Sequence, residues 1–293
     1  RTRLQSRIGT KTRIEVITEG VFTRMILDDP GLEGVGVVLF DEFHERSLDA
    51  DLGLALARET QGALREDLRL LVMSATLDSA RVAKLLGDAP VVESEGRAFP
   101  VETRYPGRDA RDPIERPMAD AILRALRADP GSVLAFLPGQ AEIRRTETLL
   151  KDRLDDPNVD VVALYGALDT SVQDRAIEPA PPGKRKVVLA TSIAETSITI
   201  LGVRIVVDSG LARINQIHQR TGFESLDLIR ISKASATQRA GRAARNGPGV
   251  VYRAWIPYDE LSMKDFDPPE ISRIDLSETL LLLSSLGVTN PEN

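Results

Sequence analysis

Val35-Gly36-Val37-Val38-Leu39-Phe40-Asp41-Glu42-Phe43-His44 is the stretch that decides the fold. Its apolar half is short and β-branched, which predicts a buried parallel strand. Asp41 and Glu42 then stand at the C-terminal end of that strand, where open α/β sheets bind ligands. Two neighbouring acids there suit metal–nucleotide chemistry, in which one orients Mg²⁺ and the other polarises a water molecule. The same acids would equally serve as a helix N-cap, and this stretch alone leaves both interpretations open.

Segments that favour strands and segments that favour helices alternate along the rest of the chain. This alternation predicts an α/β fold with a doubly wound parallel sheet. The further strands are expected at 13–18, 68–73, 132–137, 159–164, 187–190 and 204–208, and the helices at 20–27, 47–64, 79–86, 118–128, 140–150 and 171–177.

The alternation breaks at residues 95–117, where four prolines stand among charged residues. Such a composition predicts an interdomain linker. We therefore expect a first domain over 1–97 and a second over 98–264. From about residue 265 the character changes again, with a Pro-Pro pair and a leucine-rich helix at 276–286 that begins a third unit.

The composition excludes several classes of protein. The 293 residues include no cysteine and 2 histidines, so disulfides, thiolate metal sites and a structural zinc site are excluded. A net charge of −6 argues against binding nucleic acid by bulk charge alone. No apolar run approaches the roughly 18 residues of a membrane span, and no signal-peptide pattern opens the sequence. We expect a cytoplasmic protein without a membrane partner.

A second informative cluster lies at residues 238–245, Gln-Arg-Ala-Gly-Arg-Ala-Ala-Arg. On a helix, Arg239, Arg242 and Arg245 would occupy neighbouring positions on one face. Clustered guanidinium groups repel one another unless they bind an anion, and a polyphosphate would satisfy that need. An arginine delivered from one domain to a phosphate held by another is a known catalytic device. The alternative is a basic surface helix that binds nothing.

These two clusters occur in order with two others, Ser74-Ala75-Thr76 and residues 190–197. Together they resemble motifs II, III, V and VI of the DEAH-box group of superfamily 2 helicases. Thr18-Glu19-Gly20 resembles motif Ib, and residues 134–140 resemble motif IV. The resemblance runs from about residue 13 to residue 252 and is strongest to the bacterial HrpB family. It implies two RecA-like parallel-sheet domains, the first truncated at its N-terminus, followed by the start of a winged-helix-like segment.

The resemblance implies a role for each residue that matches a motif. Asp41 would hold Mg²⁺ through water, Glu42 would activate the hydrolytic water and also lie beside the metal, and His44 would link the nucleotide to the second domain. Further nucleotide contacts or couplings would come from Ser74, Thr76, Ser197 and Gln238, with Arg242 and Arg245 as arginine fingers. Contacts to nucleic acid would come from Thr18, Gly20, Gly139 and Thr191.

The function that the resemblance implies is an ATP-dependent helicase. It would be a monomer that couples hydrolysis of ATP with Mg²⁺ to movement along single-stranded nucleic acid, with RNA as the expected substrate. The chain contains no Gly-x-x-x-x-Gly-Lys-Ser/Thr, the loop that cradles phosphates, and Gly9-Thr10-Lys11-Thr12 lacks its spacing. We therefore expect the chain by itself to hydrolyse no ATP. The alternative is a non-catalytic module that binds nucleic acid or a partner on a helicase scaffold.

Overall fold

The computed structural model describes residues 8–75, 79–94, 99–108, 111–195, 198–218 and 221–288. The chain divides into two compact units. The first unit combines Arg1–Ser94 with Pro268–Asn293, and the second unit is Glu95–Asp267. The C-terminal segment therefore belongs to the same unit as the N-terminal segment, although the whole second unit separates them in the sequence. The predicted boundaries at 97 and 264 stay predictions.

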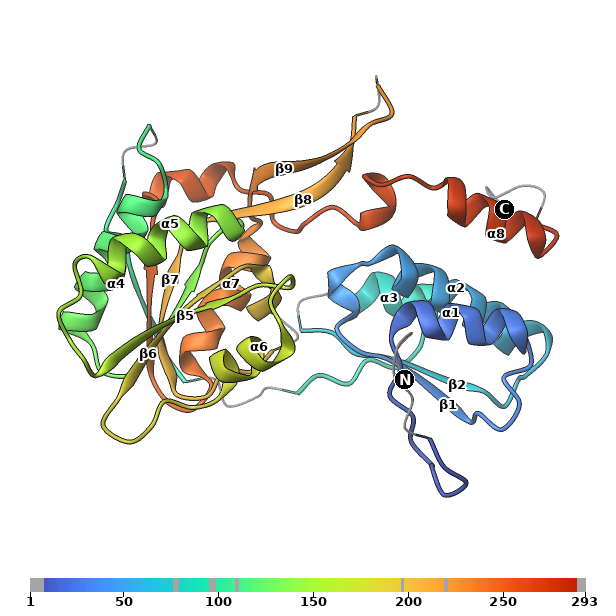
Figure 1. The fold of residues 1–293 in the computed structure, drawn as a ribbon. Helices are drawn as coiled ribbons and strands as arrows, with labels where there is room; N and C mark the ends of the chain where they lie inside the picture. The colour runs from blue at the N-terminus through green and yellow to red at the C-terminus, as the bar shows by residue number, and fades with distance from the viewer. Residues whose placement is uncertain are drawn as a thin grey trace. The chain divides into compact units, whose positions relative to one another are not determined.

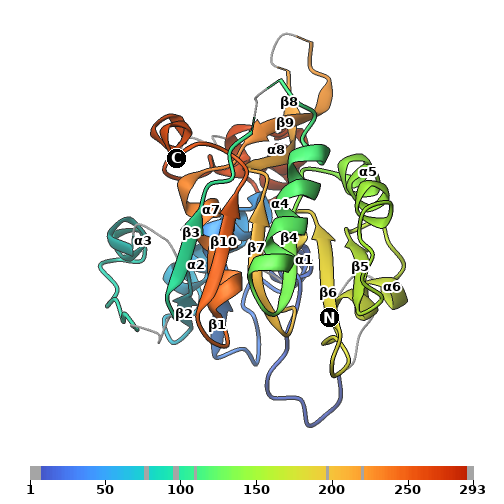
Figure 2. The ribbon, with the colours of Figure 1, turned by 90° about the vertical axis from the view of Figure 1, so that its left-hand side faces the viewer.

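The second unit is built on a six-stranded sheet in which every pair of neighbouring strands is parallel (Figures 1 and 2). Parallel pairing confirms the α/β class. Its strands, in their order across the sheet, are β3 (Val101–Arg104), β10 (Gly249–Arg253), β7 (Val203–Asp208), β4 (Ser132–Phe136), β6 (Arg185–Ala190) and β5 (Val159–Leu164).

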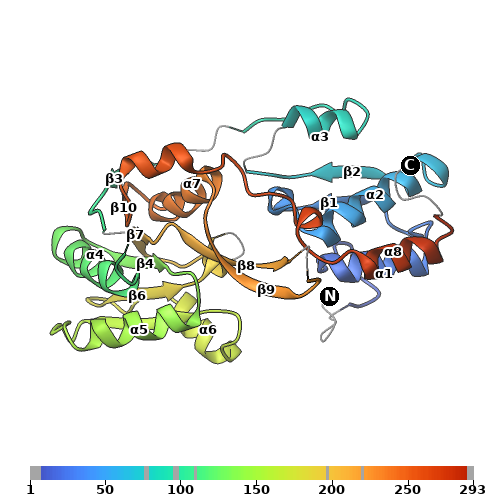
Figure 3. The ribbon, with the colours of Figure 1, turned by 90° about the horizontal axis from the view of Figure 1, so that it is seen from above.

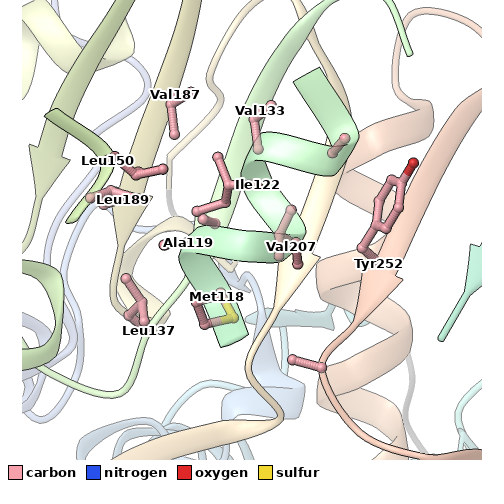
Figure 4. Close-up of a cluster of buried hydrophobic side chains, with 14 of the residues drawn as sticks. Met118, Ala119, Ile122, Val133, Leu137, Leu150, Val187, Leu189, Val207 and Tyr252 are labelled. Carbon is pink, nitrogen blue, oxygen red and sulfur yellow. The ribbon is translucent and has the colours of Figure 1, made fainter. Parts of the chain in front are cut away.

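Helices cover both faces of this sheet, which is why its central strand β4 is apolar except for Ser132 at its start. All five residues of β4 are buried. Val133 and Ala135 pack with α4 (Glu115–Ala128) and α5 (Gln140–Lys151) in the cluster that Figure 4 shows. Leu134 and Phe136 point to the other face, toward α6 (Thr170–Ile177) and α7 (Lys233–Gly241). Successive residues of one strand therefore serve two cores.

The first unit has a smaller parallel sheet, in which β1 (Val37–Phe40) pairs with β2 (Arg69–Val72). Its inner face packs against α1 (Glu19–Asp28) and α2 (Leu48–Ala63). The outer face is open within the described residues, where Val37 and Leu39 are 49% and 54% exposed. The expectation that this strand is buried is therefore wrong for alternate residues, because helices cover only one face. The unit also contains α3 (Ser79–Leu85) and α8 (Ser277–Ser285).

Other predictions about elements were wrong or incomplete. Residues 13–18 form no strand. Part of the predicted linker is β3, an edge strand, where flanking prolines are tolerated because one edge needs no partner. The antiparallel ribbon formed by β8 (Leu211–Ile217) and β9 (Glu224–Arg230), seen in Figures 1 and 3, was not predicted from the sequence. Among the described helices, none is long and apolar enough to cross a membrane.

Candidate functional site

The acid pair opens a tight turn at the end of β1, residues 41–47, which we name the acid turn. Glu42 and Arg46 both adopt left-handed backbone conformations, with φ of 50° and 51°. These positions flank the short 3-10 helix Phe43–Glu45. Left-handed conformations cost a non-glycine residue roughly 1–2 kcal/mol, so the surroundings must hold them. Phe43 does so, since its ring is buried and its N–H donates to Met73 O at 3.1 Å.

Neither acid caps the helix that follows the turn. The N-cap of α2 is Ser47, whose Oγ accepts from the Ala50 N–H at 3.1 Å. Asp41 Oδ1 instead accepts from the N–H of Glu42 at 2.9 Å. The interpretation of the acid pair as a helix cap is therefore wrong. Asp41 is exposed and the Glu42 side chain is 43% exposed, so both carboxylates are accessible to a ligand.

His44 joins the acid turn to the end of β2. Its side chain is only 7% exposed, and its Nε2 lies 3.5 Å from Glu42 Oε2. Its Nδ1 accepts from the Ala75 N–H at 3.4 Å. The ring thus lies between the catalytic candidate Glu42 and the Ser74-Ala75 segment, with Ser74 exposed after β2. Thr76, the other candidate there, lies outside the described residues.

Arg239 is a buried structural cation in the second unit, 1% exposed. Its Nε donates to Glu195 Oε2 at 2.8 Å and its Nη1 to Asp208 Oδ1 at 2.9 Å. The guanidinium also lies 4.8 Å from the centre of the Phe136 ring. Burial opposes the charge, but the two carboxylates outweigh it and raise the pKa of Arg239. The prediction that all three arginines lie on one face that binds an anion is therefore wrong, because Arg239 pairs with Glu195 and Asp208 of the protein itself.

Arg242 and Arg245 follow α7 through a 3-10 turn, Arg242–Ala244, rather than a continuous α-helix. Arg242 is 6% exposed, and donates to the Glu195 carbonyl at 2.6 Å and to the Ile198 carbonyl at 2.9 Å. Arg245 is exposed and donates to the Thr199 hydroxyl. The backbone after β6 thus fixes one candidate arginine finger and leaves the other accessible.

The remaining candidates lie at element ends. Gln238 is half-buried on α7, and Ser197 lies outside the described residues. In the first unit, Thr18 is the exposed N-cap of α1 and Gly20 lies in its first turn. In the second unit, Gly139 is the N-cap of α5, and Thr191 follows β6. Because β4 and β6 are parallel neighbours, Gly139 and Thr191 lie beyond the same edge of the sheet.

Sequence reasoning missed three residues that build this region. Glu195 and Asp208 hold Arg239, and Asp208 ends β7 just as Asp41 follows β1, a signal that the sequence did offer. Gly249 is needed for close approach, since a Cβ there would lie 2.3 Å from the Ala243 carbonyl oxygen. This glycine therefore lets β10 pass beside the 3-10 turn that carries Arg242. No sequence pattern marked it.

Glu142 forms a further buried network beside Gly139. It is 7% exposed, and its Oε1 accepts from Arg213 at 3.0 Å and from Arg145 at 3.3 Å. Burial raises the pKa of this carboxyl, but its own N–H and the two arginines outweigh burial, and the net shift is downward. The network ties the start of α5 to β8.

The lowered pKa of Glu142 predicts a pH dependence of stability. A carboxyl whose pKa is lower in the folded state than in the unfolded state stabilises the protein at pH values above its ordinary pKa of 4.5. This contribution is lost as the pH falls through the pKa of the folded state. We expect Glu142→Gln to flatten the decline of the unfolding free energy below pH 4.5, measured by urea denaturation. Glu147→Gln, on the same helix, is the control that should keep the wild-type slope. An unchanged slope in Glu142→Gln would contradict the assignment.

Comparisons with known proteins find helicases that are similar to this chain. The family model described as "Helicase conserved C-terminal domain" matches residues 117–247. The ATP-dependent RNA helicase HrpB of Escherichia coli is 50% identical over 291 residues, 99% of this chain and 36% of that protein. The pre-mRNA-splicing factor ATP-dependent RNA helicase prp22 of Schizosaccharomyces pombe is 38% identical over 98% of this chain and 25% of that protein.

Two solved structures of E. coli HrpB, titled as a DExH-box NTPase and a DEAH/RHA helicase, match the fold. Their TM-scores are 0.89 and 0.92, each at 49% identity. The matches cover 100% and 99% of this chain but 36% and 37% of those chains.

Residues 117–247 thus match a helicase C-terminal domain, and the chain is similar in sequence and fold to ATP-dependent helicases. Among these helicases, the chain is similar to HrpB, titled a DExH-box and a DEAH/RHA helicase, along nearly its whole length. It spans about a third of HrpB and a quarter of prp22, two of the curated relatives that it matches.

Proposed function

We propose that this chain supplies the water-activating and charge-stabilising groups of an ATP-driven RNA helicase. The observation that carries the proposal is the acid turn, which presents Asp41 and Glu42 at the C-terminal end of a parallel strand. Glu42 would act as the general base for the attacking water, and His44 would orient it from a buried position. The two relatives are named as ATP-dependent RNA helicases, which supports ATP as the nucleotide and RNA as the substrate.

The donor set of the acid turn fits Mg²⁺. This ion prefers hard oxygen ligands and keeps several of its waters, so one or two carboxylates suffice. Asp41 would hold it through water, with Glu42 beside it. When bound, Mg²⁺ would neutralise charge on the phosphate oxygens. In the part of the chain that the structure describes, no group of three or more His, Asp or Glu side chains is placed to hold a metal ion, the acid turn included.

The second unit would contribute cations to the triphosphate. Arg242 is held in place by backbone carbonyls, so little reorganisation would accompany reaction. The exposed Arg245 and the half-buried Gln238 would complete this group. Ser74, Thr76 and Ser197 would couple the nucleotide state to the positions of the two units. Hydrolysis by these groups is a matter of positioning and charge stabilisation.

Nucleic acid would be held by hydroxyls and backbone amides rather than by a broad basic surface. Thr18 and Gly20 stand at the start of α1, and Gly139 at the start of α5, where free N–H groups favour phosphate. Thr191 would add a hydroxyl. Such contacts are independent of base sequence, which suits movement along a single strand. The proposed enzyme would be monomeric and cytoplasmic.

A hybrid protein tests this function. The chain replaces the segment of E. coli HrpB with which it is 50% identical, and ATP turnover is measured with and without single-stranded RNA. We expect turnover that rises with RNA in the hybrid, and none from this chain alone. A folded hybrid that binds RNA without stimulated turnover would instead favour the non-catalytic module, an alternative raised by the missing Gly-x-x-x-x-Gly-Lys-Ser/Thr sequence.

A further inference from the structure

Residues 264–267 close the N-terminus of α7, the helix that carries Gln238 and Arg239. The first N–H groups of a helix have no partner within it and must find acceptors elsewhere. Here the first two amides of α7 and the hydroxyl of its capping residue all bond to this segment. The bonds run from Lys233 N to Lys264 O (2.9 Å), from Ala234 N to Asp265 O (3.1 Å) and from Ser232 Oγ to Asp267 Oδ2 (2.9 Å).

Glu270 closes the N-terminus of α2, the helix that follows the acid turn. Its Oε2 accepts from the Leu48 N–H at 2.8 Å, across 222 positions of sequence. Its own N–H donates to the Arg46 carbonyl at 3.0 Å. Arg46 is one of the two left-handed residues of the acid turn. Glu270 therefore braces the backbone that holds Glu42.

Only Pro268 and Pro269 separate these two attachments in sequence. Pro269 has φ −59° and ψ 148°, the polyproline II conformation. Two consecutive prolines form a stiff connector, because each ring fixes its φ angle. Once one attachment has formed, a stiff connector raises the effective concentration of the groups that form the other. Each attachment should therefore stabilise the other.

We propose that residues 264–270, which we name the strap, couple the acid turn to α7, with Glu270 as a positioning residue for that turn. The strap caps one helix in each unit, and these helices adjoin the acid pair and the arginines. Its role in catalysis rests on the proposed function, in which those groups act on one ATP. The mechanical coupling itself does not rest on the proposed function, since it depends only on the hydrogen bonds and the proline connector.

Hydrogen exchange of single amides in the full chain tests the coupling. Glu270→Ala removes an acceptor from the start of α2, and we expect the Leu48 amide to exchange about fivefold faster, the effect of losing one helix cap. The informative amides are Lys233 and Ala234 in the other unit, which we expect to exchange about two- to threefold faster. The amide of Ala135, buried in β4, should be unchanged and reports global unfolding.

The matched control makes the connector flexible. Pro268→Gly/Pro269→Gly keeps every acceptor of the strap, and Glu270→Ala in that background should affect Leu48 but no longer Lys233 or Ala234. Unchanged exchange at Lys233 and Ala234 in the single variant would overturn the proposal, as would an equal change in both backgrounds. If Ala135 also exchanges faster, its rate gives the part of the change that is due to global unfolding, and only a larger increase at Lys233 and Ala234 counts as coupling.

These rates are measured without nucleotide or RNA. A hybrid helicase that lacks RNA-stimulated turnover would therefore contradict the proposed function while leaving the strap standing. Conversely, unchanged exchange at Lys233 and Ala234 in Glu270→Ala would contradict the proposed coupling by the strap, even if the hybrid hydrolyses ATP.

Discussion

Replacing Glu42 by Gln in the HrpB hybrid is expected to lower RNA-stimulated ATP turnover by about 10²- to 10⁴-fold, the usual contribution of a positioned general base. The amide is nearly the same size as the carboxylate but cannot take a proton from water. Because the loss lies in the chemical step, kcat should fall while the KM for ATP changes little. Steady-state turnover measured across ATP concentrations separates these two parameters.

Glu45→Gln is the matched control for this prediction. Glu45 lies in the same acid turn, three residues on, and its side chain is exposed. The substitution removes the same charge from the same loop, so general electrostatic effects on Mg²⁺ or RNA would appear in both variants. Comparable losses in the two variants would remove Glu42 from the role of general base.

The second large effect is expected at Arg239. Arg239→Gln leaves the fully buried carboxylate of Asp208 and the partly buried carboxylate of Glu195 without their cation. Breaking a buried ion pair by removing one partner costs about 3–5 kcal/mol. We expect the unfolding free energy of the second unit to fall by that amount, measured by urea denaturation. Arg144→Gln, at an exposed position of α5, should change it by less than about 0.5 kcal/mol.

A rescue variant separates lost charge pairing from lost packing. Adding Glu195→Gln and Asp208→Asn to Arg239→Gln removes the stranded negative charges while keeping the side-chain shapes. We expect this triple variant to be more stable than Arg239→Gln alone, since replacing both partners of a buried pair costs less than replacing one. A triple variant less stable than the single one would show that packing, rather than unpaired charge, dominates at this site.

Short-range patterns in the sequence predicted most helices and strands of both units. The strands β4, β5 and β6 are recognisable because each is a short apolar run between helical segments. The acid pair was also correctly placed after β1, because that placement depends only on adjacent residues. The ribbon of β8 and β9 escaped prediction since polar and apolar residues mix along it, and β3 escaped because prolines surround it.

The arginine cluster shows where local patterns fail. Spacing alone makes Arg239, Arg242 and Arg245 look equivalent, yet Arg239 pairs with Asp208 and Glu195, which lie 31 and 44 residues away. Arg242 bonds to carbonyls and Arg245 to a hydroxyl. Which guanidinium is internal depends on where β7 and the segment after β6 run, and no helical periodicity contains that information.

By itself, the sequence determined the α/β class, the parallel strand that ends at the acid pair, and the order of the motifs that resemble those of helicases. Each of these depends on residues a few positions apart. The tertiary structure alone decided that Ser47 rather than the acid pair caps α2, that Arg239 is buried, and that Glu270 accepts from Leu48 at the start of α2, 222 positions away. The physical reason is that burial and hydrogen-bond partners are set by segments that meet only after the chain has folded.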